Sequence, residues 1–292
     1  MGKIFNLDPA GEQQRRVHLR SGGGHKEKRL AHSLKGLRVL HIDDDPMMAE
    51  LVKMMLEREG ATVSSSSGGS SGVDALYDVL PNVVLLDLKM PLMDGFDVLH
   101  SMRAHSGMRE CPVICLTGTT SRRDIEHAVR MGAEGYLFKP VDMNHLAMLV
   151  RCFSAGVTPE DRLETLLGDD RYSGVAGETR GKVESLLELE IIGVIGRAGG
   201  LALDLGHIAR LADATREEAE PALASLETAG LISKNSGPPE SPGTSLGDPT
   251  FVPARPAVRD GTWGRLMSIA EDPDKLVIFI NLLCAGVLGG ED

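Results

Sequence analysis

The sequence predicts an α/β fold, a doubly wound five-stranded parallel sheet, followed by a second and mainly α-helical domain. Three observations support this prediction. Short apolar runs, typical of strands buried on both faces, alternate five times with helical patterns over residues 37–155. Several of these runs end in polar residues, as strands of open parallel sheets do at functional sites. A separate set of capped helical patterns begins near residue 184.

Five short segments are the predicted strands of the sheet. Residues 38–42 and 83–88 are the clearest, because they are aliphatic and meet acidic residues where they end. The other three are predicted at residues 61–66, 112–117 and 135–139. Because a helix follows each strand, consecutive strands are expected to run parallel.

Capping signals mark the starts of the intervening helices. Asp45 followed by Pro46 is typical of a helix N-terminus. Ser121 and Asp124 form a capping box, and Gly132 ends the helix that this box begins. The five predicted helices span residues 46–59, 73–80, 96–105, 122–131 and 142–153.

Composition divides the chain into four predicted parts. Residues 1–36, with eight basic and three acidic side chains, are predicted to be a basic flexible arm. Residues 37–155 form the α/β domain, in which the Ser/Gly-rich stretch 64–72 is predicted to be a flexible loop. Residues 156–183 mix Pro, Gly and acids, as an interdomain linker does, and residues 184–292 form the second domain.

Charge and cysteine content limit the class of protein. The net charge of -11 argues against broad electrostatic capture of nucleic acid, although the basic arm leaves local binding open. The four cysteines contain no C-x-x-C pair, which favours reduced, buried thiols. The longest apolar run, Leu276–Leu288, is interrupted by Asn281 and is shorter than the ~20 residues of a membrane helix. We therefore expect a cytoplasmic protein that does not enter a membrane, with this run in the core or in a homodimer contact.

Polar residues stand at the carboxyl ends of four predicted strands, namely Asp43 with Asp44, Asp87, Thr117 and Lys139. Parallel strands bring these ends together. Three neighbouring carboxylates repel one another unless a cation is bound, and an all-oxygen ligand set suits Mg²⁺. A lysine and a hydroxyl would complete a receptor for a phosphoryl group, which the Asp87 carboxylate would attack. From strand 83–88 alone, Asp87 could be either an ordinary acidic loop residue or a nucleophile. The polar residues at the other strand ends favour its assignment as a nucleophile.

Residues 37–155 resemble the receiver domain of two-component response regulators, whose sheet is flavodoxin-like. The matching residues are Asp43-Asp44, Asp87 with Met90-Pro91 and Asp94-Gly95, Thr117, and Lys139-Pro140. The resemblance implies that Asp87 is the phosphoacceptor. It also implies that Asp44, Asp87 and the backbone carbonyl of Lys89 coordinate Mg²⁺ directly, and that Asp43 does so mainly through water.

The resemblance assigns the remaining site residues as well. Thr117 and Lys139 would bind phosphoryl oxygens, and the peptide bond between Lys139 and Pro140 would be cis. Tyr136 would be an aromatic switch, although a half-buried surface aromatic explains this residue equally well. His41 departs from the pattern, because an aliphatic residue is more usual there. It is expected to be a core residue that does not touch the site.

The resemblance also implies a partner, a histidine kinase or phosphotransfer protein that donates the phosphoryl group from a phosphohistidine. The protein would then phosphorylate itself without turnover, so it is not expected to be an enzyme. The enzyme alternative is a phosphatase with an aspartyl nucleophile. That class usually has a second Asp two positions after the nucleophile, where this chain has Lys89.

Residues 184–257 resemble a winged helix-turn-helix domain. The resemblance rests on Ile208-Ala-Arg-Leu211, the capping box Thr215-Arg-Glu-Glu218, and Leu223, Leu226 and Gly230-Leu-Ile232. It implies regulation of transcription by DNA binding, with Arg216 and Lys234 as candidate contacts. The helix 215–228 carries four glutamates, however, which would repel DNA. The alternative is a phosphorylation-controlled adaptor whose second domain binds protein.

Overall fold

The computed structural model describes residues 34–235 and 249–288. The predicted basic arm therefore lies almost wholly outside the described residues. The first sheet contains β1 (Arg38–Ile42), β2 (Thr62–Ser66), β3 (Val83–Asp87), β4 (Val113–Thr117) and β5 (Gly135–Phe138). Its strands are all parallel and follow the order β2-β1-β3-β4-β5, which is the flavodoxin-like order. The predicted fold class of this domain is confirmed.

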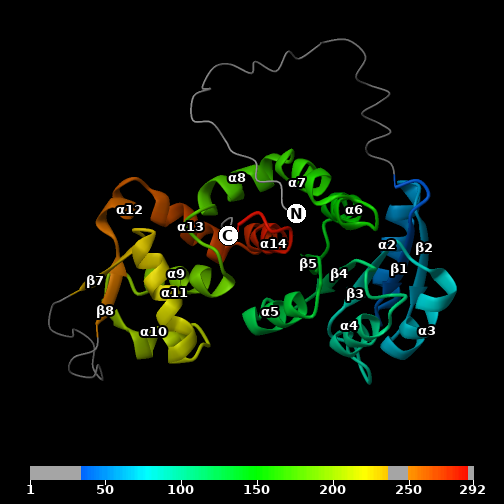
Figure 1. Cartoon of the computed structure of the whole chain (residues 1–292), viewed down its shortest axis with the longest axis horizontal. Helices are drawn as coiled ribbons and strands as arrows, with labels where there is room; N and C mark the ends of the chain where they lie inside the picture. The colour runs from blue at the N-terminus through cyan, green and yellow to red at the C-terminus, as the bar shows by residue number, and fades with distance from the viewer. Residues whose placement is uncertain (1–33, 236–248, 289–292) are drawn as a thin grey trace, which may run out of the picture. The chain divides into compact units, whose positions relative to one another are not determined.

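Four helices connect the strands and a fifth follows β5, and together they cover both faces of the sheet (Figure 1). They are α2 (Pro46–Arg58), α3 (Gly69–Val79), α4 (Gly95–Ala104), α5 (Arg122–Arg130) and α6 (Met143–Phe153). Helix α2 contacts α6, and α3 contacts α4. β3 and β4 are buried at every position, which explains why they are uniformly apolar up to their polar last residues.

Helix α3 begins at Gly69, inside the stretch that was predicted to be a flexible loop. Its early glycines are needed for close packing. A Cβ atom on Gly72 would lie 2.7 Å from the Ile42 side chain, and one on Gly69 would lie 2.6 Å from the Met93 carbonyl oxygen. The Ser/Gly composition thus reflects tight contacts of a helix and not a flexible loop.

The predicted linker is also folded, and this prediction is corrected. It contains α7 (Pro159–Leu167) and α8 (Asp170–Thr179). Thr158 caps α7 and Asp169 caps α8, and both caps accept backbone N–H bonds. Leu166 and Tyr172 are fully buried, so these helices belong to the hydrophobic core.

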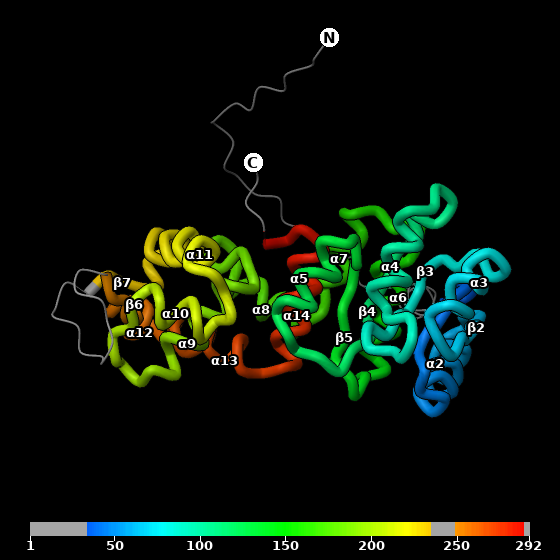
Figure 2. The backbone as a smooth tube through the Cα atoms, turned by 90° about the horizontal axis from the view of Figure 1, so that it is seen from below, coloured from blue at the N-terminus to red at the C-terminus, as the bar shows by residue number. Residues whose placement is uncertain are grey.

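The remaining elements form the second predicted domain, and the last of them packs against the first domain. They are α9 (Leu186–Arg197), β6 (Leu203–Asp204), α10 (Leu205–Leu211), α11 (Arg216–Thr228), β7 (Ile232–Asn235), β8 (Thr250–Pro253), α12 (Arg255–Arg259), α13 (Thr262–Glu271) and α14 (Pro273–Cys284). The three strands form an antiparallel sheet in the order β6-β8-β7. Helix α14 lies beside β5 (Figures 1 and 2), so the last part of the predicted output domain packs on the first domain.

Among the described residues, no helix is long and apolar enough to cross a membrane. The run Leu276–Leu288 is instead part of the chain's own core, because α14 contacts β5, α8 and α13. The alternative of a dimer contact through this run is not supported. All four cysteines are unpaired, as predicted.

Candidate functional site

Three carboxylates meet at the carboxyl ends of β1 and β3. Ile42 pairs with Leu86, so the next residues, Asp43 and Asp87, emerge side by side. Oxygens of Asp43, Asp44 and Asp87 lie within 4.8 Å of one another, and the first and last of these residues are buried. This all-carboxylate donor set, with one exposed member on the open side, fits a hard divalent cation such as Mg²⁺.

Lys139 joins two of these carboxylates. Its Nζ lies 2.5 Å from Oδ2 of Asp87 and 2.8 Å from Oδ2 of Asp43. Burial would lower the pKa of Lys139, but the hydrogen bonds to Asp43 and Asp87 outweigh it and raise that pKa. Burial would raise the pKa of Asp43, but the contacts of its carboxylate with His41 and Lys139 lower that pKa to about 2. Both shifts favour the charged forms of Asp43 and Lys139, and the Lys139 ammonium is fixed beside Asp87. The Lys139-Pro140 bond is cis, as expected.

Thr117 and Tyr136 lie on the neighbouring strands β4 and β5. Thr117 is fully buried, and its Oγ1 accepts a hydrogen bond of 3.2 Å from the Thr119 amide. Tyr136 is fully buried too, so its interpretation as a half-buried surface aromatic is wrong. The Tyr136 hydroxyl has no hydrogen-bond partner among the described residues. Its assignment as a switch remains a prediction.

Two residues beside the site have contacts that the sequence analysis missed. His41 was expected not to touch the site, but its Nε2 lies 3.4 Å from Oδ2 of Asp43. This contact follows from strand alternation, because Asp43 directly follows β1 and residues two apart in an extended chain point the same way. Gly95 packs so tightly that a Cβ atom there would lie 2.3 Å from the Asp87 carbonyl oxygen. Glycine at this position therefore allows α4 to approach the backbone of Asp87.

Lys89 links Asp87 to α5. Its amide donates a 2.9 Å hydrogen bond to Oδ1 of Asp87, which orients that carboxylate. Its Nζ forms an ion pair of 2.9 Å with Asp124, in the first turn of α5. The predicted role of the Lys89 carbonyl as a metal ligand remains a prediction.

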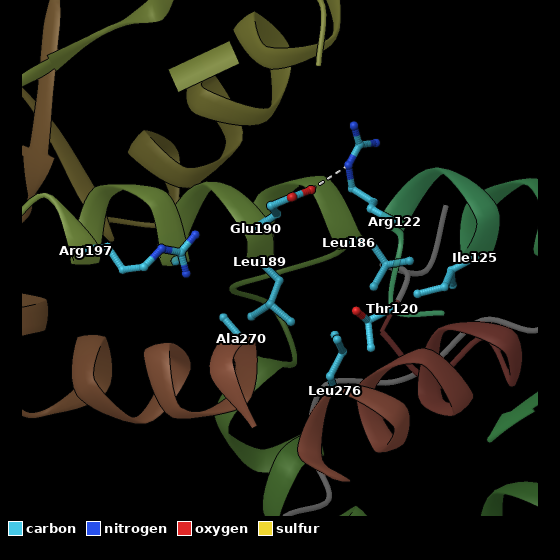
Figure 3. A pocket seen from close by; sticks show the side chains of 10 residues that line it. Thr120, Arg122, Ile125, Leu186, Leu189, Glu190, Arg197, Ala270 and Leu276 are labelled. Atoms are coloured by element: carbon cyan, nitrogen blue, oxygen red, sulfur yellow. Dashed lines mark hydrogen bonds and ion pairs between the residues drawn. The ribbon is translucent and has the colours of Figure 1, made fainter. Parts of the chain in front are cut away.

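The start of α5 is in turn bound to the second domain. Arg122 donates to Oε2 of Glu190 on α9 at 2.7 Å and to the carbonyl of Asp213 at 2.8 Å, and Arg123 forms an ion pair with Asp213 at 2.7 Å. Figure 3 shows the Arg122–Glu190 contact beside a cavity of about 180 Å³ between α5, α9, α13 and α14. Burial raises the pKa of Glu190, and Arg122 opposes this effect. No sequence signal pointed to these contacts, because each joins residues far apart in the chain.

The two candidate DNA contacts lie on different elements, Arg216 at the start of α11 and Lys234 on β7. Lys234 on β7 forms an ion pair of 2.8 Å with Glu227 of α11. The Arg216 guanidinium lies beside Gly206, at the start of α10. Both assignments remain predictions.

Comparison with known proteins is consistent with this geometry. Residues 39–151 match the family described as the response regulator receiver domain. The DNA-binding response regulator MtrA of Mycolicibacterium smegmatis is 37% identical over 114 residues, which are 39% of this chain and 49% of MtrA. An uncharacterized 14.6 kDa protein of Leptolyngbya boryana is 34% identical over 128 residues, which are 44% of this chain and 98% of that protein.

Solved structures are also similar to part of the chain. The chemotaxis protein CheY4 of Vibrio cholerae is 26% identical, and the match covers 39% of this chain and 96% of CheY4 with a TM-score of 0.38. The chain spans about half the length of MtrA, the curated relative named first.

Proposed function

Because the chain belongs to the response regulator receiver family through residues 39–151, we propose that Asp87 accepts a phosphoryl group from a phosphohistidine of a histidine kinase or phosphotransfer protein. The observation that carries this proposal is the position of Asp87 between two other carboxylates and Lys139. A carboxylate oxygen of Asp87 attacks phosphorus, the new P–O bond forms, and the P–N bond to the donor imidazole breaks.

The chain's own side chains perform the steps around this transfer. Asp44, Asp43 and Asp87 would hold Mg²⁺, which neutralises charge on the phosphoryl oxygens when it is bound. Lys139 exchanges its contact with the Asp87 carboxylate for one with a phosphoryl oxygen, so its charge follows the new anion. Thr117 donates its hydroxyl to another phosphoryl oxygen. Water later hydrolyses the acyl phosphate, so the protein acts as a switch and not as an enzyme with turnover.

The phosphodonor would dock on α2, immediately next to the acceptor site. Met47, Leu51 and Met54 form an exposed apolar row at helical spacing on this helix. The helix begins at Pro46, two residues after Asp44. A partner bound there would hold its phosphohistidine close to Asp87.

The direct test is labelling by acetyl phosphate in the presence of Mg²⁺. Wild-type protein should become labelled, and Asp87→Asn should not. Asp78→Asn, which changes an exposed acid on α3, is the matched control and should label normally. Undiminished labelling of the Asp87 variant would refute the assignment.

For the output we propose regulation of transcription through DNA. The order α9-β6-α10-α11-β7-β8 with an antiparallel three-stranded sheet is the order of a winged helix, and MtrA is named as a DNA-binding regulator. The acidic helix α11 favours a second candidate, an adaptor that binds protein and no DNA. Glu217, Glu218 and Glu220 are all exposed on it.

A salt series on genomic DNA fragments separates these two outputs. Phosphate contacts require that the logarithm of the binding constant falls linearly with the logarithm of salt concentration. The measurement is made on phosphorylated and unphosphorylated protein. A negative slope supports DNA binding, and no binding at low salt in either state supports the adaptor. The predicted homodimer is tested on the same samples by light scattering.

A further inference from the structure

The outer edge of β5 is the feature that the phosphoacceptor chemistry leaves unexplained. β5 is the last strand of the parallel sheet, so one side of it has no neighbouring strand. Edge strands expose N–H and C=O groups that must find water or another partner. Tyr136, in the second position of β5, is fully buried and cannot use water.

Asn281 supplies the missing partner from α14. Its Oδ1 accepts the Tyr136 N–H at 2.8 Å, and its Nδ2 donates to the Tyr136 carbonyl at 2.9 Å. The same Nδ2 donates to the Val277 carbonyl at 2.9 Å, so both amide protons are used. One side chain thus makes the two bonds that a neighbouring strand would make.

The helix that carries Asn281 is held firmly between the two domains. Six consecutive residues of α14, 277–282, are buried, so the helix is enclosed by β5, α8 and α13. Asp272 is both the last cap of α13 and the first cap of α14, where it accepts the amide of Asp274 at 3.0 Å. Because no loop separates the two helices, a displacement of α14 is carried into α13, which packs on α9.

The other end of this connection is the phosphoacceptor site. Lys139 directly follows β5, and its Nζ is bound to the Asp87 carboxylate. A phosphoryl group on Asp87 moves the negative charge away from the carboxylate, and Lys139 must follow it. The movement of Lys139 displaces the end of β5, three residues from Tyr136. The paired bonds to Asn281 depend on the position of both Tyr136 backbone groups.

We propose that α14 is the output element of the receiver, and that Asn281 transmits the state of β5 through α14 and α13 to α9. This proposal rests on the proposed function, because the signal is a phosphoryl group on Asp87. The docking partner of the β5 edge is thus a helix of the same chain, and the pair Asn281–Tyr136 is the coupling contact.

The test combines phosphorylation with hydrogen exchange in the full chain. Acetyl phosphate and Mg²⁺ are added, the phosphorylated fraction is measured by intact mass, and exchange is followed in peptides from 135–138 and 262–284. Phosphorylation should change exchange in both segments of the wild type by about tenfold, the effect of one hydrogen bond made or lost. It should also change the fluorescence of Trp263 on α13, the only tryptophan.

Asn281→Leu keeps the bulk of the side chain but removes both bonds to Tyr136. This variant should become phosphorylated to the same extent, while the response of α13 and Trp263 is lost. Asp274→Asn, an exposed change on the same helix, is the control and should respond as the wild type does.

Two outcomes overturn the coupling. One is a phosphorylated wild type whose exchange in 262–284 is unchanged, a measurement that needs no variant. The other is an Asn281→Leu protein that responds as the wild type does. A wild type that takes no phosphoryl group refutes the proposed function instead, and the inference with it.

Discussion

Arg122 should contribute more to stability than any exposed cation of α5. Its side chain is 9% exposed and makes bonds of 2.7 Å to Glu190 and 2.8 Å to the Asp213 carbonyl. Each hydrogen bond of a charged group contributes about 1.5–3 kcal/mol. Arg122→Met retains the aliphatic stem and removes both bonds, as well as the ion pair of 2.8 Å with Glu126 on the same helix. Glu190, which is 32% exposed, regains some water, so we expect a loss of about 2–4 kcal/mol in the free energy of unfolding.

The assay is urea unfolding followed by circular dichroism and Trp263 fluorescence. Arg130→Met is the matched control on the same helix. Arg130 is 68% exposed and lies 3.8 Å from Glu126, so its loss should cost less than about 1 kcal/mol. If the two variants unfold within about 0.5 kcal/mol of each other, the Arg122 contacts do not hold the domains together, and the reasoning is wrong.

Three further predictions concern the receiver. Gly95→Ala places a methyl group 2.3 Å from the Asp87 carbonyl oxygen and should lower stability by about 1–3 kcal/mol in thermal unfolding, whereas Gly107→Ala, with no neighbour within 4 Å, should not. Burial lowers the pKa of His145 to about 4, below its value in the unfolded chain, so the free energy of unfolding should fall by about 3 kcal/mol as pH drops from about 6.5 to 4. His145→Gln should abolish this dependence, and a variant whose stability depends on pH as the wild type's does would contradict the reasoning. EDTA should stop labelling by acetyl phosphate and added Mg²⁺ should restore it, whereas labelling that persists in EDTA would argue against a metal at the three carboxylates.

The candidate site was predictable because its parts are local signals. A strand that ends in Asp87 and another that ends in Lys139 can be recognised in a few residues each, and the parallel sheet then brings them together. Strand periodicity also placed His41 on the same side as Asp43, but a histidine in an aliphatic run was interpreted as core only. The caps Thr158 and Asp169 were visible as well, but Pro and Gly nearby suggested a linker.

The contacts between domains were not predictable in the same way. Asn281 looked like an interruption of an apolar run, and only the position of β5 explains it. Arg122 looked like an ordinary residue of a helix start. In both cases the contact forms because two segments that are distant in the sequence pack together. A single sequence contains no periodic signal for such a pair.

The contact between Asn281 and Tyr136 joins residues 145 positions apart, and this separation has a consequence for biosynthesis. At translation rates of about 5–20 residues per second, roughly 7–29 s pass between the synthesis of β5 and that of its partner. During this time the sheet exists with an unpaired, apolar edge, the kind of surface on which nascent chains associate. The order of events on the ribosome therefore means that the receiver is completed only after α9 to α13 have been made, although its own strands are made before them.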